Sequence, residues 1–375
     1  MYLSELSLKK FRNYIDINIS LKNGINILIG KNAQGKTNFL ESIYVLSLTH
    51  SHRTNNDRDL INWDNNEAYI GGKLVKKTGI IPIELIIGKK GKKGKVNHLE
   101  QTKLSTYVGN INVVLFAPED LKIVKGSPSI RRQFMNQEFG QISPKYLYNL
   151  SQYKSILKQK NNYLKKIKYN KSSDLLYLDV LNDQLSAYGA EIVKARKKFL
   201  KKLEKWSQDL YGKISQNAEK LTFDYNNQVS EKPDDSIDVF YEKYKKKFKE
   251  YQKKEIDQGT TLIGPHRDDL LFKLNNKNVQ SFGSQGQQRS VALAVKLSEI
   301  DLMKEVTGEY PILLLDDVLS ELDDFRQTHL LKAIQSKVQT FLTTTSLSGI
   351  IKKLIDTPKI FKVNSGNIVE IEGDK

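Results

Sequence analysis

"GKNAQGKT", residues 30–37, is the stretch that decides the fold. It fits the pattern G-x-x-x-x-G-K-[ST] and lies between an apolar run, "INILI" (25–29), and a helix-like run, "KTNFLESIYVLSL" (36–48). Glycines let backbone N–H groups turn toward phosphate, the lysine adds positive charge and the threonine hydroxyl can bind Mg²⁺. The sequence therefore predicts a nucleotide-phosphate loop made of Gly30, Lys31, Asn32, Ala33, Gln34, Gly35, Lys36, Thr37 and Asn38.

A second motif, "ILLLDD" (312–317), is the expected partner of this loop. Four apolar residues predict a strand buried on both faces, and carboxylates at its end are costly unless they meet a cation. We expect Asp316 to hold Mg²⁺ through water and Asp317 to polarise the water that attacks the nucleotide. The alternative is a carboxylate that only caps the next helix.

A third motif, "GSQGQQR" (283–289), opens the helix-like repeat "VALAVKLSEI". Ser284 offers a hydroxyl, Gly286 permits close backbone approach, and unpaired N–H groups at a helix start attract an anion. Taken alone, the run favours an ordinary loop and helix cap.

Composition limits the class of protein. The 60 Lys and Arg residues against 43 Asp and Glu give a net charge of +17, which draws polyanions, nucleic acid before an anionic membrane surface. The absence of cysteine excludes disulfides, thiol catalysis and zinc–thiolate sites. No apolar leader and no run of about 18 apolar residues is present, so we expect a cytoplasmic protein without a membrane role.

The pattern of apolar residues along the chain changes twice. Residues 1–120 and 256–375 are β-rich with interspersed helices, whereas residues 121–255 have long amphipathic stripes. We predict one α/β head with mixed β-sheets, assembled from both ends of the chain, and an inserted α-helical arm at 121–255. The arm has 29 Lys and Arg against 16 Asp and Glu, which favours a nucleic-acid surface over a merely solvated face.

A lysine-rich loop, "GKKGKKGK" (88–95), allows two interpretations. Lysines often keep the edge or tip of a hairpin in solvent. Basic clusters of this kind also contact phosphate. Both interpretations stay open.

Six separated motifs, in the same order along the chain, resemble the RecF family of ATP-binding-cassette ATPases, which is similar to the heads of SMC proteins. They are "FRNY" (11–14), "SHRTNNDRDLI" (51–61), "FAPEDLKIVKGSPSIRRQFMN" (116–136), "LIGPHRDDL" (262–270), "SQGQQRS" (284–290) and "LLLDDVLSELD" (313–323). The arm and the last thirty residues carry little of the resemblance.

The resemblance implies an ATPase head that uses Mg²⁺, dimerises on ATP, binds double-stranded and gapped DNA, and helps to load recombinase with RecO and RecR. Lys36, Asp316 and Asp317 would be catalytic, and Arg12 would lie near the nucleotide phosphates. A signature acting on the ATP of a second copy would consist of Ser284, Gln285, Gly286 and Gln287. A D-loop at the dimer interface would consist of Ser320, Glu321, Leu322 and Asp323.

Three positions depart from the wider ATP-binding-cassette pattern. "APED" (117–120) stands where a Q-loop glutamine is expected, and "TTTS" (343–346) stands in place of a switch histidine, so Thr344 and Thr345 are the candidates to contact the γ-phosphate. Asp317 replaces the commoner glutamate and is one methylene shorter, which predicts slow hydrolysis that times a switch. The roles of Arg53, His266 and Arg267 stay open.

Three other functions remain as alternatives. A transporter subunit has no evident use for a basic insertion, and another SMC-like head would have a coiled coil of hundreds of residues. A nucleotide-dependent scaffold whose arm binds protein is the third. DNA affinity that falls with salt separates the DNA-binding interpretation from the scaffold.

Overall fold

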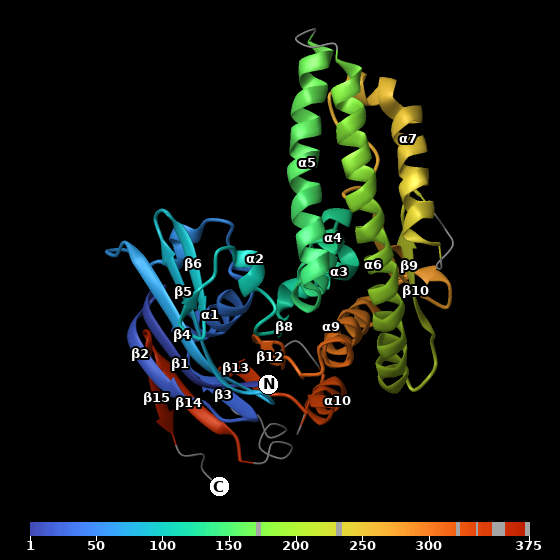
Figure 1. Cartoon of the computed structure of the whole chain (residues 1–375). Helices are drawn as coiled ribbons and strands as arrows, with labels where there is room; N and C mark the ends of the chain where they lie inside the picture. Colours follow the sequence, from blue (N-terminus) through green and yellow to red (C-terminus); the bar gives the residue numbers. More distant parts are fainter. Residues whose placement is uncertain (170–173, 230–234, 320–322, 335–336, 347–356, 372–375) are drawn as a thin grey trace. The chain divides into compact units, whose positions relative to one another are not determined.

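The structure is a computed structural model that describes residues 1–169, 174–229, 235–319, 323–334, 337–346 and 357–371 (Figure 1). The chain divides into two compact units. The first unit combines Met1–Asp120 with Val295–Lys375, and the second is Leu121–Ala294.

An antiparallel sheet forms one layer of the first unit, in the order β2-β1-β4-β5-β6-β7. Alternating apolar residues place one side of each long strand in the core, as along β1, where Leu6 and Leu8 are fully buried. The strands are β1 (Tyr2–Phe11), β2 (Tyr14–Ser20), β4 (Glu67–Lys76), β5 (Gly79–Gly88), β6 (Gly91–Val96) and β7 (Leu99–Glu100).

A second sheet has the order β15-β14-β3-β13-β12-β8, and all its strands are parallel except β15. Its central strands are apolar on both faces, as parallel strands covered on both sides must be. The strands are β3 (Ile25–Ile29), β8 (Val113–Phe116), β12 (Ile312–Leu315), β13 (Thr340–Thr344), β14 (Lys359–Asn364) and β15 (Asn367–Ile371).

Helix α1 (Lys36–Leu48) contacts strands of both sheets, so it is buried over most of its circumference. Side chains of α1 and of both sheets form one continuous apolar core. The shorter elements of this unit are η1 (Asp57–Leu60), α2 (Leu104–Tyr107), η2 (Pro118–Asp120) and α10 (Asp324–Ile334). The antiparallel sheet, the mixed sheet and the strand-loop-helix order confirm the predicted α/β fold.

The second unit is mainly helical. Its long helices α5, α6 and α7 pack side by side, and α6 buries a stripe that includes Leu181, Leu185, Ile192, Phe199 and Leu203 (Figure 1). At 41 residues, α6 is about 60 Å long at 1.5 Å per residue. The helices are α3 (Leu121–Lys125), α4 (Pro128–Ile142), α5 (Pro144–Lys168), α6 (Leu175–Ser215), α7 (Ile237–Gln258), α8 (Val279–Phe282) and the first part of α9 (Gln285–Thr307).

The second unit extends past residue 255, where the sequence analysis placed the return to the head. The reason is strand pairing: β9 (Leu221–Asn226), which follows α6, pairs with β10 (Asp269–Leu274), and β10 pairs with β11 (Lys277–Asn278). The segment before β10 is also part of this unit, and its residues Ile263 and Asp268 are buried. In the described part of the chain, no helix is both long and apolar enough to cross a membrane.

Buried polar contacts bind the "GPHRDD" segment to the helices. Arg196 of α6 donates to Pro265 O (2.8 Å) and to Tyr146 Oη of α5 (3.0 Å), and it contacts Asp268 (3.4 Å). His266 lies against Tyr153 of α5, with 2.7 Å between the ring Nδ1 and the phenol oxygen. The His266 side chain therefore lies in the interior of the arm unit.

Candidate nucleotide-binding site

The loop at residues 30–37 has the conformation that its sequence predicts. Gly35 has a φ of 117°, and a Cβ there would lie 2.6 Å from the amide nitrogen of Asn13, so only glycine fits. The Lys36 ammonium folds back over the loop, donating to Gly30 O (2.6 Å) and Lys31 O (3.0 Å). The ammonium is thus held inside the ring of backbone that would surround a phosphate.

Asp316 directly follows strand β12 and contacts this loop. Asp316 Oδ1 accepts hydrogen bonds from Thr37 Oγ1 (3.1 Å) and Thr343 Oγ1 (2.9 Å). A hydroxyl and a carboxylate side by side are the hard oxygen donors that Mg²⁺ prefers. The residues present therefore fit a magnesium site.

Burial and neighbouring charges shift the pKa values of Lys36 and Asp316. Burial lowers the pKa of Lys36, although Asp317 and Asp316 act in the opposite direction. Burial raises the pKa of Asp316, and hydrogen bonds from the two threonines and the charge of Arg53 offset part of the rise. A divalent cation or a phosphate would stabilise the charged form that burial disfavours at each group.

Asp317 has a left-handed backbone, with a φ of 51°, and its N–H donates to Thr343 Oγ1 (2.8 Å). Thr343 therefore contacts both acids of the motif, although the sequence analysis named only Thr344 and Thr345. The Thr344 hydroxyl instead donates to Ser346 O (2.7 Å). Thr343 lies on β13, which pairs with β12 in parallel. Its contact with the two acids could be predicted only from the order of the strands.

Arg12 lies in the β1–β2 turn, next to Asn13, whose side-chain amide donates to Gln34 O of the loop (3.2 Å). The Arg12 guanidinium makes two hydrogen bonds to Glu41 of α1, at 2.9 and 2.8 Å. Glu41 was not predicted as a site residue, although a glutamate one turn after Thr37 in an apolar helix is a signal that could have indicated it. Arg53 contacts the same carboxylate and Asn38 Oδ1 (2.7 Å).

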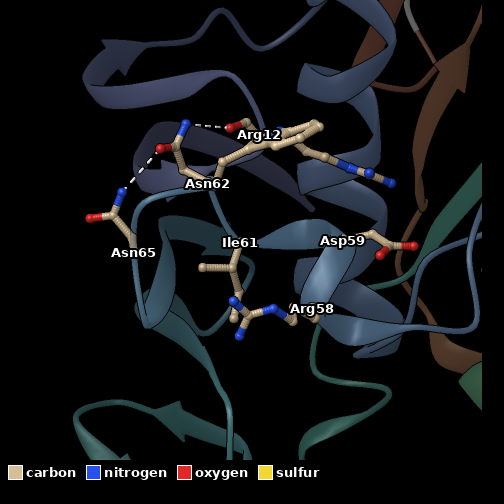
Figure 2. A pocket seen from close by; sticks show the side chains of 7 residues that line it. Arg12, Arg58, Asp59, Ile61, Asn62 and Asn65 are labelled. Carbon is tan, nitrogen blue, oxygen red and sulfur yellow. Dashed lines mark hydrogen bonds between the residues drawn. The ribbon is translucent and has the colours of Figure 1, made fainter.

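A cavity of about 400 Å³ adjoins Arg12 (Figure 2). Asn62 forms part of its wall, donating to Arg12 O (2.8 Å) and accepting from Asn65 (3.0 Å). Trp63 lines the cavity with an indole that is 93% exposed. The remaining lining residues are Arg58, Asp59 and Ile61.

The signature residues lie in the second unit, at the start of α9. Ser284 Oγ accepts from Gln287 N (3.2 Å), and Gln287 Oε1 accepts from Ser284 N (2.7 Å), which is a capping box. Ser284 and Gln285 are exposed and Gly286 is half-buried. The helix start is therefore ordered with its serine accessible.

The remaining predicted residues divide into three cases. Ser320, Glu321 and Leu322 lie outside the described residues, while Asp323 accepts from Arg326 N (2.9 Å) at the start of α10. In "APED", Asp120 accepts from Ala117 N (2.8 Å) and closes a turn. Arg267 donates to Thr261 O (2.9 Å) inside the arm unit.

The lysine-rich loop forms a hairpin tip, with Lys89 and Lys90 exposed between β5 and β6. The lysines that follow have local partners. Lys92 contacts Asp57 at 2.6 Å, and Lys93 contacts Glu100 at 3.4 Å. The tip thus offers fewer unpaired charges than its sequence suggests.

Known proteins of one family are similar to this chain over almost its whole length. Residues 2–368 match the family model of the RecF/RecN/SMC N-terminal domain. The chain is 59% identical over all 375 residues to the DNA replication and repair protein RecF of Latilactobacillus sakei subsp. sakei (strain 23K), with both chains fully covered. It is 58% identical to RecF of Pediococcus pentosaceus over 99% of each chain. The chain belongs to the RecF family.

A solved structure of the recombination mediator protein RecF with ATP, from the RecFOR pathway, has 34% identity and a TM-score of 0.92 over 99% of this chain and 98% of that one. An Smc head bound to a domain of ScpA shares the fold, with 16% identity and a TM-score of 0.56 over 99% and 98% of the two chains. These likenesses confirm the RecF resemblance and the ATPase-head fold of ATP-binding-cassette and SMC type.

Proposed function

We propose that this RecF-family chain is an ATP-dependent DNA-binding protein of recombinational DNA repair and replication-fork maintenance, acting in the cytoplasm. The observation that carries the proposal is the contact between Thr37 and Asp316, beside the Lys36 ammonium. This arrangement joins a phosphate loop to a metal carboxylate. The RecF relatives and the RecF structure with ATP support the same ligand.

Each residue of the site has a defined task. Lys36 binds the β- and γ-phosphates, and Thr37 and Asp316 hold Mg²⁺, which neutralises phosphate charge when bound. Asp317 orients the water that attacks the γ-phosphate. Because Asp317 is short and its backbone is fixed by Thr343, hydrolysis is slow and times a switch.

The signature acts on a second copy of the chain. Ser284 and Gly286, at the exposed start of α9, bind the γ-phosphate of ATP held by the partner copy. ATP binding then stabilises the dimer, and hydrolysis through Asp317 releases it.

The arm supplies the DNA surface. Its surplus of 13 positive charges neutralises phosphates without reading sequence, which suits double-stranded DNA and gap junctions. Five lysines of α7 are exposed: Lys245, Lys246, Lys249, Lys253 and Lys254. RecO and RecR are the proposed partners in recombinase loading, as the family resemblance and the RecFOR context of the solved relative suggest.

DNA binding by the purified chain, with and without ATP, tests the proposal. Affinity should require ATP, be lost in Lys36→Ala, and fall by at least about tenfold between 50 and 200 mM salt. Charge reversal of Lys246 and Lys249 to glutamate should weaken binding, and reversal of Lys89 and Lys90, which changes the charge equally, shows whether the hairpin tip also contributes. Salt-insensitive or absent DNA binding with ATP would favour the protein scaffold.

A further inference from the structure

Glu41 is a buried carboxylate that the ATPase reaction does not use. Its side chain is fully buried, yet it accepts two hydrogen bonds from Arg12, one from Ser51 (2.5 Å) and one from Arg53 (3.3 Å). The arginines and Ser51 hold the pKa of Glu41 below its usual range, against the effect of burial. Glu41 is therefore ionised and binds two arginines at once.

This cluster connects directly to the phosphate loop. Arg53 Nη1 donates to Asn38 Oδ1 (2.7 Å), and the Asn38 amide donates to Asn13 Oδ1 (2.8 Å). Asn13 in turn donates to Gln34 O (3.2 Å) within the loop. Three side chains, those of Arg53, Asn38 and Asn13, thus connect Glu41 by hydrogen bonds to the backbone of the phosphate loop.

The two arginines are held unequally. Arg12 makes a two-pronged contact and its side chain is 19% exposed, whereas Arg53 makes one longer contact and is 43% exposed. A two-pronged arginine–carboxylate contact fixes both position and orientation. Arg12 is therefore held in one orientation. The guanidinium of Arg53 can turn toward solvent while its backbone keeps its position.

We propose that Glu41 is a positioning residue that holds Arg12 and Arg53 so that their charge acts on the terminal phosphate of bound ATP. The inference rests on the proposed ATP site. Arg53 donates to Asn38 beside the loop, and Glu41 fixes the position of its positive charge, rather than the amount of charge, so that it favours a triphosphate over a diphosphate. Glu41 thereby sets the preference for ATP over ADP without touching the nucleotide.

A merely structural ion pair would affect folding alone, so the test measures nucleotide preference. Glu41→Gln keeps the size of the side chain and removes its charge. The matched control is Glu299→Gln, because Glu299 is also fully buried and pairs with Lys296 (2.8 Å) on α9, in the same unit. The readouts are the dissociation constants of ATPγS and ADP with Mg²⁺, and the melting temperature.

We expect Glu41→Gln to weaken ATPγS binding about tenfold and ADP binding much less, as loss of a charge-assisted contact implies. Glu299→Gln should lower the melting temperature with an unchanged ratio of the two constants. If Glu41→Gln does not fold, Glu41→Asp keeps the charge on a shorter side chain. It should lower the ratio of the ADP dissociation constant to the ATPγS dissociation constant.

A double-mutant cycle with Arg53→Gln gives the decisive result. Arg53→Gln should weaken ATPγS binding about tenfold in the wild-type background and by less than about twofold in the Glu41→Gln background, because Arg53 is already misplaced there. Additive effects, or an unchanged ratio in Glu41→Gln, would overturn the positioning role while leaving the ATP site intact. A wild-type chain that binds neither nucleotide would instead refute the proposed function.

Discussion

Thr37 and Asp316 are 279 positions apart in the chain, and the threonine hydroxyl donates to the aspartate carboxylate across 3.1 Å. The contact exists because α1 begins at the end of β3, and β13 alone separates β3 from β12 in the parallel sheet. Ligand sites in such sheets form at the carboxyl ends of strands. The pair is therefore the expected centre of magnesium binding.

Removal of either partner should reduce magnesium-dependent ATP binding. Asp316→Asn keeps the shape but removes the charge, and Thr37→Val removes the hydroxyl. We expect ATP affinity in Mg²⁺ to fall about 10- to 100-fold for each, with little change in EDTA. Calorimetric titration measures both, and Thr37→Ser, which keeps the hydroxyl, should bind like the wild type. Equal affinity of wild type and Asp316→Asn in Mg²⁺ would contradict the assignment.

Asp317 should separate hydrolysis from binding. Asp317→Asn is expected to lower turnover about 100-fold or more, as loss of a base that orients water does, while ATP affinity stays the same. Asp317→Glu, one methylene longer, should raise turnover. Steady-state phosphate release with DNA present measures these rates. A wild-type rate well above the ordinary enzyme median of about 10 s⁻¹ would contradict the slow switch.

The sequence predicted the parts of the site that are continuous in the chain. The loop at 30–37 and the acids after β12 follow local patterns, and the structure places them together. Glu41 and Thr343 escaped prediction because their contacts depend on which strands and turns are neighbours. The compact unit that contains the arm continues past the predicted boundary near residue 256, because β10 pairs with β9, which nothing local in the sequence shows.

The capping role of Ser284 decides which variants can test the dimer. Ser284→Ala removes the cap and should cost about 1 kcal/mol of stability, so its failure to dimerise would be ambiguous. Ser284→Asp keeps an oxygen that can accept from Gln287 N but adds a negative charge facing the γ-phosphate.

We expect Ser284→Asp and Ser284→Arg to abolish ATP-dependent dimers, whereas Ser284→Thr retains them. Sedimentation with a non-hydrolysed ATP analogue gives the dimer fraction. Lys36→Arg serves as a comparison that is expected to keep ATP binding while losing turnover. An unchanged dimer fraction in Ser284→Asp, with a normal melting temperature, would exclude the signature acting in trans.

His266 should make the arm unit sensitive to acid. Burial lowers the pKa of His266 to about 4, and the charges of Arg267, Lys160 and Arg132 act in the same direction. In the unfolded chain this histidine binds a proton near pH 6.5, whereas in the folded chain it does so only near pH 4. The neutral histidine therefore contributes fully to the free energy of unfolding above pH 6.5, and this contribution falls as the pH drops toward 4. The loss amounts to roughly 3 kcal/mol. Asp268 acts oppositely, since burial raises its pKa to about 6.

The difference between wild type and variant isolates the histidine. The chain has two tryptophans, and only Trp206 lies in the arm unit, so its fluorescence in a Trp63→Phe background reports unfolding of that unit. The stability of His266→Gln should be lower at pH 7, because contacts to Tyr153 and Thr261 are lost, but should change less between pH 6.5 and 4. His98→Gln removes an exposed histidine of the other unit and should keep the wild-type slope. The same slope in all three proteins would show that the arm does not titrate through His266.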